Sequence, residues 1–150
     1  MRYFTIEELS RSDRARCMGI DNTPTPEAVC NLRKLVEAVL DPLRERYGYP
    51  IMVSSGYRCP RLNKAVGGSA TSDHMRGRAV DIYCNDPRDN AVIFAMIYWL
   101  LPFDQLIWER GTDEYPAWVH VSYREGDNRR ECKRTRDGVK YYSHKPSIKP

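Results

Sequence analysis

Apolar positions recur at helical spacing over one long stretch near the start of the chain. Residues 25–27, Thr-Pro-Glu, are typical of a helix start, because a capping hydroxyl precedes proline at the first helical position and an acid in the first turn. The apolar stripe that follows predicts one buried face: Val29, Leu32, Val36, Val39, Leu40 and Leu43. Pro42 should kink this helix or break it in two, and Gly48 should end it.

Weaker signals predict three further helical segments. Thr5 and Glu8 have capping-box spacing, which predicts a short helix from Ile6. Asp86-Pro87 opens a second long helix to about Leu101, and Arg61–Ala65 is long enough for one helical turn. The core face expected for the second long helix consists of Ala91, Phe94, Ile97, Tyr98 and Leu101. Residues 18–24 lack periodicity and read as a loop.

Four short runs show strand patterns: Ile51–Val53, Ala79–Tyr83, Gln105–Glu109 and Trp118–Tyr123. In the second run, alternation places Val80 and Ile82 on one face and puts Asp81 on the other. A polar loop over residues 110–117 joins the last two strands. The pattern predicts an α+β fold, with two main helices packed on one face of a small, mainly antiparallel sheet.

Composition narrows the class of protein. At 150 residues, with 41% hydrophobic and 29% charged residues, the chain is typical of one soluble globular domain. It has no apolar run of eighteen residues, so we expect no membrane span. Its first residues lack the apolar stretch and cleavage site of a secretory signal. We therefore expect a protein made in the cytoplasm without a signal peptide, which would need host-cell lysis or packaging in a particle to leave the cell.

Charge is unevenly distributed along the chain. Residues 129–150 contain eight Lys or Arg and two acidic residues, which gives +6, so the net charge of +4 leaves 4 − 6 = −2 on residues 1–128. We therefore predict a single domain over residues 1–128 and a basic C-terminal tail over residues 129–150. The tail could bind a polyanion or could simply be a solvated terminus. It lacks aromatic-interleaved nucleic-acid modules, so no specific nucleic-acid partner is expected.

The five cysteines are odd in number, widely spaced and without a C-x-x-C pair. This pattern matches neither a zinc ribbon nor a dense disulfide framework. Free thiols are the favoured interpretation, and a single bridge from Cys59 to Cys84 is the alternative.

Two histidines and one aspartate lie in settings that suggest a metal site. His74 precedes Asp81 by seven positions, and His120 lies in the last predicted strand. A catalytic zinc ion usually takes three such protein ligands and leaves a fourth position for water. Convergence requires a turn at Gly77 and a place for His120 on a strand beside Asp81, facing the same way. Taken singly, each histidine could instead be a satisfied core residue, and the aspartate a hydrogen-bond acceptor.

The run Ser72-x-His74-x-x-Gly77-x-Ala79-x-Asp81, followed by the motif Trp118-Val119-His120-Val121-Ser122, resembles the D-alanyl-D-alanine metallopeptidases. These zinc carboxypeptidases belong to a superfamily that includes lysostaphin-type enzymes and the hedgehog signalling domain. Residues 54–58 and 62–69 look like the family's smaller branch, common in phages and bacteria. The resemblance extends from about Ile51 to Tyr123.

This resemblance implies one zinc ion held by His74, Asp81 and His120, and a carboxylate near it as general base. In some relatives the acid lies three positions before the last histidine, where this chain has Ala117. In the hedgehog-like arrangement the glutamate ends the strand that pairs with the histidine strand. Glu109 matches that position in the hairpin and is therefore favoured as the base. The loop residues Asp113 and Glu114 are alternatives, and Glu109 could instead be a solvent-facing charge at a strand end.

Arg58 matches the family's arginine for the terminal carboxylate of the substrate, a task that suits a permanently charged, bidentate donor. A structural salt bridge is the alternative for Arg58. Ser72 could hydrogen-bond the substrate or support a ligand. His144 lies in the basic tail and is expected to be unrelated to the metal.

The resemblance implies a zinc-dependent peptidase that hydrolyses peptidoglycan stem peptides by metal-activated water, as a D-alanyl-D-alanine carboxypeptidase. The alternatives are a peptidoglycan endopeptidase that acts in lysis and a zinc-stabilised, non-catalytic module that binds the cell wall. Its expected site of action is the cell wall or periplasm. The sequence does not indicate an oligomeric state.

Overall fold

The computed structural model describes residues 1–149. The α-helices are α1 (Ile6–Ser10), α2 (Asp13–Cys17), α3 (Pro26–Leu35), α4 (Asp41–Tyr47), α5 (Pro60–Ala65) and α6 (Asp89–Leu100). A π-helical segment, η1 (Val36–Leu40), and a 3-10 segment, η2 (Asp73–Arg76), complete the helical elements. The strands are β1 (Ile51–Ser55), β2 (Ala79–Cys84), β3 (Gln105–Glu109), β4 (Trp118–Ser122), β5 (Glu131–Thr135) and β6 (Tyr141–Ser143).

The first long helix is interrupted as its proline predicts. Pro42 has no N–H to donate to the carbonyl one turn earlier, and the chain widens into the π-helical segment η1 just before it. The N–H of Asp41 reaches the carbonyl of Val36, five residues back. The helix then continues as α4 and ends at Gly48, whose φ of 83° is left-handed. Pro42 therefore changes the hydrogen-bonding pattern of the helix without stopping it.

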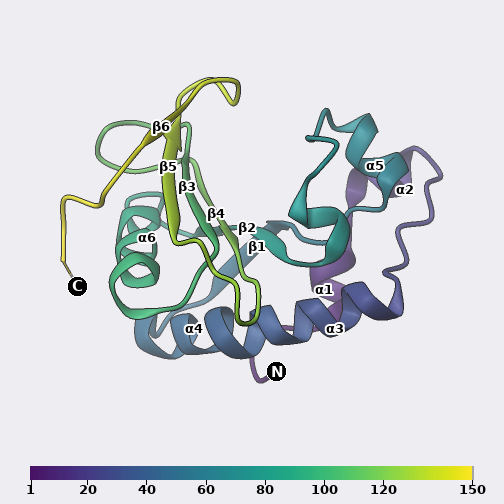
Figure 1. Cartoon of the computed structure of the whole chain (residues 1–150), viewed down its shortest axis with the longest axis horizontal. Helices are drawn as coiled ribbons and strands as arrows, with labels where there is room; N and C mark the ends of the chain where they lie inside the picture. The colour runs from purple at the N-terminus through teal and green to yellow at the C-terminus, as the bar shows by residue number, and fades with distance from the viewer. Residues whose placement is uncertain (150) are drawn as a thin grey trace.

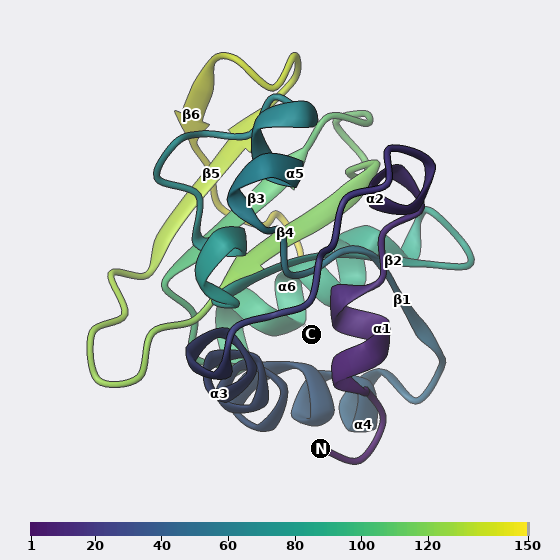
Figure 2. The same cartoon turned by 90° about the vertical axis from the view of Figure 1, so that its right-hand side faces the viewer.

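The strands form one sheet in the order β1-β2-β4-β3-β5-β6, antiparallel throughout except where β5 pairs parallel to β3. The predicted α+β fold is confirmed. Figure 1 shows α6 beside the sheet and the α3–α4 helix running across its end, while α5 lies on the other side. Figure 2, turned by 90°, shows the segment with α5 in front of the sheet and α6 behind it.

The main core lies between one face of the sheet and the long helices. Val80, Ile82, Val119 and Val121, from the two central strands, are fully buried there. The helices contribute the fully buried Leu32, Leu35, Val36, Val39, Leu40, Leu43, Ile93, Phe94 and Ile97. The opposite face of the same strands is therefore left for polar side chains.

Three predictions about elements need correction. The second long helix begins at Asp89 rather than at Pro87, because residues 86–88 form a turn in which the Asp86 carboxylate accepts the N–H of Arg88. α2 was not predicted, although Ser12 caps it. The segment 129–150 contains β5 and β6, which the sequence pattern did not predict. The division of the chain at residue 128 stays a prediction.

Asp104 ties the C-terminal segment to the sheet. Its carboxylate, which is fully buried, accepts three hydrogen bonds from Arg129: from the backbone N–H at 3.0 Å, Nε at 2.9 Å and Nη2 at 2.6 Å. Its carbonyl accepts the N–H of Glu131 at 2.8 Å. These bonds set the start of β5 against the start of β3.

Two further expectations from the sequence concern the pairing of the cysteines and a membrane-spanning segment. All five cysteines are free thiols, so the alternative of a bridge from Cys59 to Cys84 is wrong. No helix within residues 1–149 is both long and apolar enough to cross a bilayer.

Candidate metal centre and its cleft

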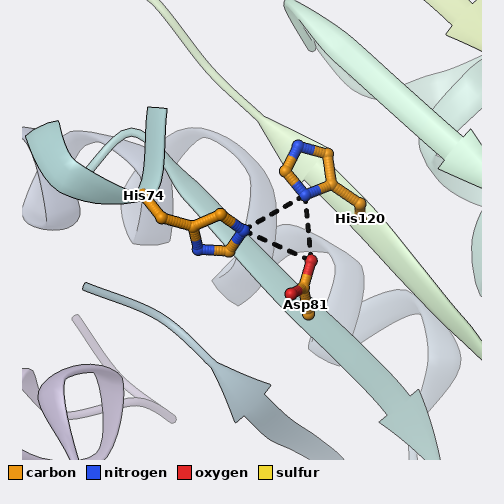
Figure 3. Close-up of side chains that lie close together, drawn as sticks. All are labelled: His74, Asp81 and His120. Atoms are coloured by element: carbon orange, nitrogen blue, oxygen red, sulfur yellow. Dashed lines mark hydrogen bonds and ion pairs between the residues drawn. The ribbon is translucent and has the colours of Figure 1, made fainter. Parts of the chain in front are cut away.

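The structure brings His74, Asp81 and His120 together on the polar face of the sheet (Figure 3). His120 Nδ1 lies 2.9 Å from Asp81 Oδ1, and His74 Nε2 lies 3.4 Å from the same oxygen. The two imidazole nitrogens are 3.3 Å apart. One ligand atom from each residue therefore points at a common centre.

The strand register explains the positions of two of these side chains. Asp81 on β2 lies directly opposite His120 on β4 in the antiparallel pair, so both side chains project from the same face. Their neighbours Val80 and Val121 face the core. The alternation that the sequence shows around Asp81 and His120 is therefore the alternation of the sheet.

His74 reaches this centre from the short segment η2. The Oγ of Ser72 accepts the backbone N–H of His74 at 3.3 Å, and Gly77 ends η2 with a left-handed φ of 67°. A Cβ at Gly77 would lie 2.3 Å from the carbonyl oxygen of Ala28, so only glycine allows this turn. Ser72 therefore positions a ligand candidate and also lines the cleft.

A backbone carbonyl fixes the tautomer of His74. Its Nδ1 lies 2.7 Å from the carbonyl oxygen of Gly56, which can only accept a hydrogen bond, so Nδ1 carries the proton. The lone pair is then on Nε2, the atom that faces Asp81 and His120. A carbonyl partner of this kind orients many metal-binding histidines.

The charges in the cluster suit a cation. Burial would raise the pKa of the Asp81 carboxyl, but His74 and His120 beside it hold this pKa well below its usual range. Burial lowers the pKa of the His74 imidazole. The cluster thus offers an ionised carboxylate and a neutral imidazole, which are the protonation states that bind metal. A cation at the centre would satisfy all three converging acceptors at once, so the residues fit a zinc ion.

Glu109 closes β3 and lines the same cleft as the three ligand candidates. Ile107, two residues earlier, lies opposite His120, so Glu109 shares the face of His120. Its side chain is buried, which contradicts the alternative of a solvent-facing charge. Burial raises the pKa of its carboxyl from 4.5 to about 7.

The two loop alternatives to Glu109 lie elsewhere. Asp113 is 72% exposed and pairs with Arg134 at 2.7 Å and Arg136 at 2.8 Å. Glu114 is exposed, and neither residue lines the cleft. Among the carboxylates considered from the sequence, Glu109 is therefore the one that the fold places beside the cluster.

Arg58 lines the cleft on the side of Asp81. Its guanidinium makes no ion pair with any residue of the described chain, 1–149, and its Nε is buried without a hydrogen-bond partner. Burial lowers the pKa of Arg58, and the charge of Asp81 opposes this shift. The alternative of a structural salt bridge is not supported, and the unpartnered donor suits an anionic group of a ligand.

The cleft has a volume of about 780 Å³, and residues that the sequence did not single out form part of it. Residues of the loop Gly67–Asp73 line it, as do Arg110, Gly138 and Tyr141. No sequence pattern indicates Tyr141, because β6 is short and lies in a charged segment. Arg110 had only a weak signal, its position directly after Glu109.

His144 lies away from the cluster, as expected. Its ring packs against Phe94, with centroids 5.6 Å apart, and against Trp108 at 5.1 Å. It therefore belongs to the packing of the C-terminal segment on the core.

Comparison with family models identifies the family of the chain. A family model described as Peptidase M15 matches residues 2–122. A comparison with curated proteins finds no match. The family match covers all of the residues in the candidate metal cluster and ends at the last residue of β4, before β5 and β6.

Proposed function

Since the chain belongs to the peptidase M15 family, a D-alanyl-D-alanine carboxypeptidase-like family of metallopeptidases, we propose that it is a zinc-dependent carboxypeptidase acting on peptidoglycan stem peptides. The observation that carries this proposal is the convergence of His74 Nε2, Asp81 Oδ1 and His120 Nδ1 within 2.9–3.4 Å. This cluster lies in a cleft large enough for a short peptide. The family implies a peptide substrate, and the proposal adds which peptide.

His74, Asp81 and His120 would hold the zinc ion. When bound there, zinc supplies a Lewis acid that polarises the scissile carbonyl and lowers the pKa of a water molecule. The chain supplies the orientation, because the strand register fixes two of the side chains and the Gly56 carbonyl fixes the third.

Glu109 is the proposed general base. Its carboxylate accepts a proton from the attacking water and then donates that proton to the departing amine. Burial, which raises its pKa to about 7, makes it a better proton acceptor than an exposed glutamate. Its position at the end of β3, on the face of His120, supports this role.

Arg58 is the proposed partner of the substrate's terminal carboxylate. A buried guanidinium with an unpaired Nε can form a charge-assisted, bidentate pair with a carboxylate. Such a pair beside Asp81 would place the last peptide bond of the substrate at the metal and give carboxypeptidase specificity. Ser72 holds the backbone of His74 and lies within reach of the same substrate.

One observation favours a second candidate, a peptidoglycan endopeptidase. A neighbouring hollow of about 520 Å³ lies beyond Arg58, and Arg58, Val66 and Asp81 line both spaces. A longer peptide could continue past the metal into this hollow instead of ending at Arg58. Under either candidate, the proposed site of action is the cell wall or periplasm, reached through phage or host release.

Metal analysis and peptide hydrolysis test the proposal together. The purified protein should contain one zinc ion per chain and release free D-alanine from a pentapeptide stem. Release of larger fragments from cross-linked muropeptides, without free D-alanine, would favour the endopeptidase. His120→Ala should lose both zinc and activity, and full activity in that variant would disprove the proposal. A Glu109→Gln variant that binds zinc and keeps full function would instead indicate a non-catalytic module.

A further inference from the structure

The cationic side chains of the cleft fall into two groups. Arg124, Arg129 and Lys133 are neutralised, because they pair with Asp73, Asp104 and Glu131. Arg58 and Arg110 also line the cleft, but neither forms an ion pair within residues 1–149. The proposed function gives Arg58 a partner in the substrate and leaves Arg110 without a role.

The backbone of Arg110 lies in a conformation that its side chain disfavours. Its φ is 53°, in the left-handed region that non-glycine residues rarely occupy. The backbone N–H of Arg110 donates to the carbonyl of Thr135 on β5 at 2.7 Å, which holds the residue in place. Glycine would adopt this conformation at lower cost, so an arginine at this position goes against the local backbone preference.

Two neighbours position the guanidinium of Arg110. It lies over the ring of Trp118, 5.7 Å from the centroid, in a cation–π contact. Gly138, at the turn between β5 and β6, is also close, because an added Cβ there would come within 3.1 Å of Arg110 Nη2. Trp118 and Gly138 also line the cleft, so the charge is held at the cleft wall.

The charge of Arg110 acts on the groups around it. It lowers the pKa of the Glu109 carboxyl and of the Tyr141 hydroxyl, in each case against a larger upward shift from burial. Arg110 is therefore close enough to the proposed base to influence a group bound beside it.

The sheet order places the two free arginines on opposite sides of the metal ligands. Arg58 follows β1 and Arg110 follows β3, while β2 and β4, which carry Asp81 and His120, lie between β1 and β3. A peptide that ends at Arg58 and crosses the metal centre would therefore run toward Arg110.

We propose that Arg110 binds a second carboxylate of the substrate, on the N-terminal side of the bond that is cut. The inference rests on the proposed function and deepens it: the preferred substrate is a peptide with an acidic residue upstream of its C-terminal bond. Arg110 is then a specificity-determining residue. The guanidinium suits this role because it stays charged and presents two parallel donors to a carboxylate.

Matched peptides test the proposal. Two stem-like peptides are compared that differ only in a glutamate or a glutamine upstream of the terminal D-alanyl-D-alanine. The zinc-loaded wild-type protein should cleave the glutamate peptide with a kcat/KM roughly 10-fold higher, mainly through a lower KM, as expected for a charge-assisted contact in a partly open site. Calorimetry with the zinc-loaded Glu109→Gln variant measures binding of the same two peptides without relying on hydrolysis.

Variants assign the preference to Arg110. Arg110→Gln should bind and cleave both peptides equally, and Arg110→Lys should keep part of the preference. Arg110→Gly should also lose the preference but melt at a temperature similar to wild type, because glycine suits the local backbone. Arg136→Gln is the control: it removes one positive charge from an exposed side chain that pairs with Asp113 outside the cleft and should keep the full preference.

The outcomes separate this inference from the proposed function. Hydrolysis of both peptides at equal rates, with equal affinities, overturns the role of Arg110 and leaves the peptidase intact. A calorimetric preference for glutamate without any hydrolysis supports Arg110 and overturns the proposed reaction. A preference that persists in Arg110→Gln overturns the assignment to this residue. Absence of both hydrolysis and a difference in binding overturns both.

Discussion

Glu109 illustrates how a residue placed for chemistry can reduce the stability of the fold that holds it. Burial raises the pKa of this carboxyl from 4.5 to about 7, so the folded protein favours its protonated form. The unfolded chain ionises near the ordinary value. As the pH rises from 4.5 through 7, ionisation therefore stabilises the unfolded state more than the folded state.

The first prediction follows from that sign. In zinc-free protein, Glu109→Gln should increase the free energy of unfolding at pH 8, by roughly 2–4 kcal/mol, and should leave it almost unchanged at pH 4. Urea unfolding at the two pH values measures the difference. Glu131→Gln is the control: the hydrogen bond from Lys133 lowers the pKa of Glu131, so this variant should gain nothing at pH 8. A Glu109→Gln variant no more stable than wild type at pH 8 would contradict the assigned burial.

Gly56 supports the metal centre without being a ligand. Its carbonyl accepts the proton of His74 Nδ1, and a Cβ at Gly56 would lie 2.0 Å from the carbonyl oxygen of Leu9. The second prediction is that Gly56→Ala shifts this carbonyl, destabilises the zinc-free protein by about 1–3 kcal/mol and weakens zinc binding roughly 10-fold. Thermal unfolding and a competitive zinc titration provide the two readouts.

Gly19 provides the comparison for this variant. It has a left-handed φ of 61°, but an added Cβ would meet nothing within 4 Å. Gly19→Ala should therefore cost about 1 kcal/mol through the backbone alone and leave zinc affinity unchanged. Equal zinc affinities in Gly56→Ala and wild type would show that the Gly56 carbonyl does not orient His74.

The residues of the cluster could be predicted because their motifs resemble those of a known family. Alternation around Asp81 and His120 gives each a face, and the turn at Gly77 has a glycine where the fold needs one, but these local patterns alone left other interpretations open. The contribution of Gly56 could not be predicted, because it depends on a contact with Leu9 that is 47 positions earlier in the sequence. The strain at Arg110 is likewise visible only in the backbone angles.

At the level of elements, the attachment of β5 depends on one buried acid. Burial would raise the pKa of Asp104, but hydrogen bonds from the Arg129 side chain and backbone bring it below its ordinary value. The stabilisation is therefore present above the pKa of an unfolded aspartate, about 3.9, and is lost as the pH falls through the lower folded value.

The third prediction is that Asp104→Asn destabilises the protein at pH 7 by about 2–3 kcal/mol, because a buried amide nitrogen then faces the guanidinium of Arg129 in place of the carboxylate. The difference from wild type should shrink below pH 4. Chemical unfolding at pH 7 and pH 3 measures both effects. Asp113→Asn is the matched control, since Asp113 pairs with two arginines but is 72% exposed, and its loss should cause no measurable change. Equal effects of the two variants would contradict the role of Asp104.

The elements that could be predicted have strong patterns of their own. The bounds of β3 match the prediction in full, because its three central residues are apolar and polar residues stand on both sides of them. β5 was missed because Glu131, Lys133 and Arg134 resemble a solvated stretch, and its parallel pairing with β3 joins segments that are not consecutive strands. Its stability comes from partners elsewhere in the chain, which a local pattern cannot reveal.

On the scale of the whole molecule, the C-terminal segment completes both the sheet and the cleft. β5 pairs with β3 along all five positions from Gln105 to Glu109, and Thr135 anchors Arg110. His144 packs on Trp108, which belongs to the main core. Tyr141 forms part of the cleft wall. These contacts link the segment beyond the family match to the residues that the family match covers.

The fourth prediction tests whether residues 1–128 fold independently, as the charge distribution suggested. Removal of residues 129–150 would expose the edge of β3, with Leu106, Ile107 and Trp108, whose backbone groups on the side of β5 would lack partners. We expect this truncated protein to melt at a lower temperature and to self-associate, because an exposed apolar edge strand pairs with other chains. Thermal unfolding and light scattering measure the two effects.

A second truncation, after His144, keeps β5, β6 and the contact of His144 with Trp108, and should remain monodisperse to the same extent as the full chain. If the protein ending at residue 128 melts and scatters like the full chain, then β5 and β6 add a cleft wall to a domain that is already complete.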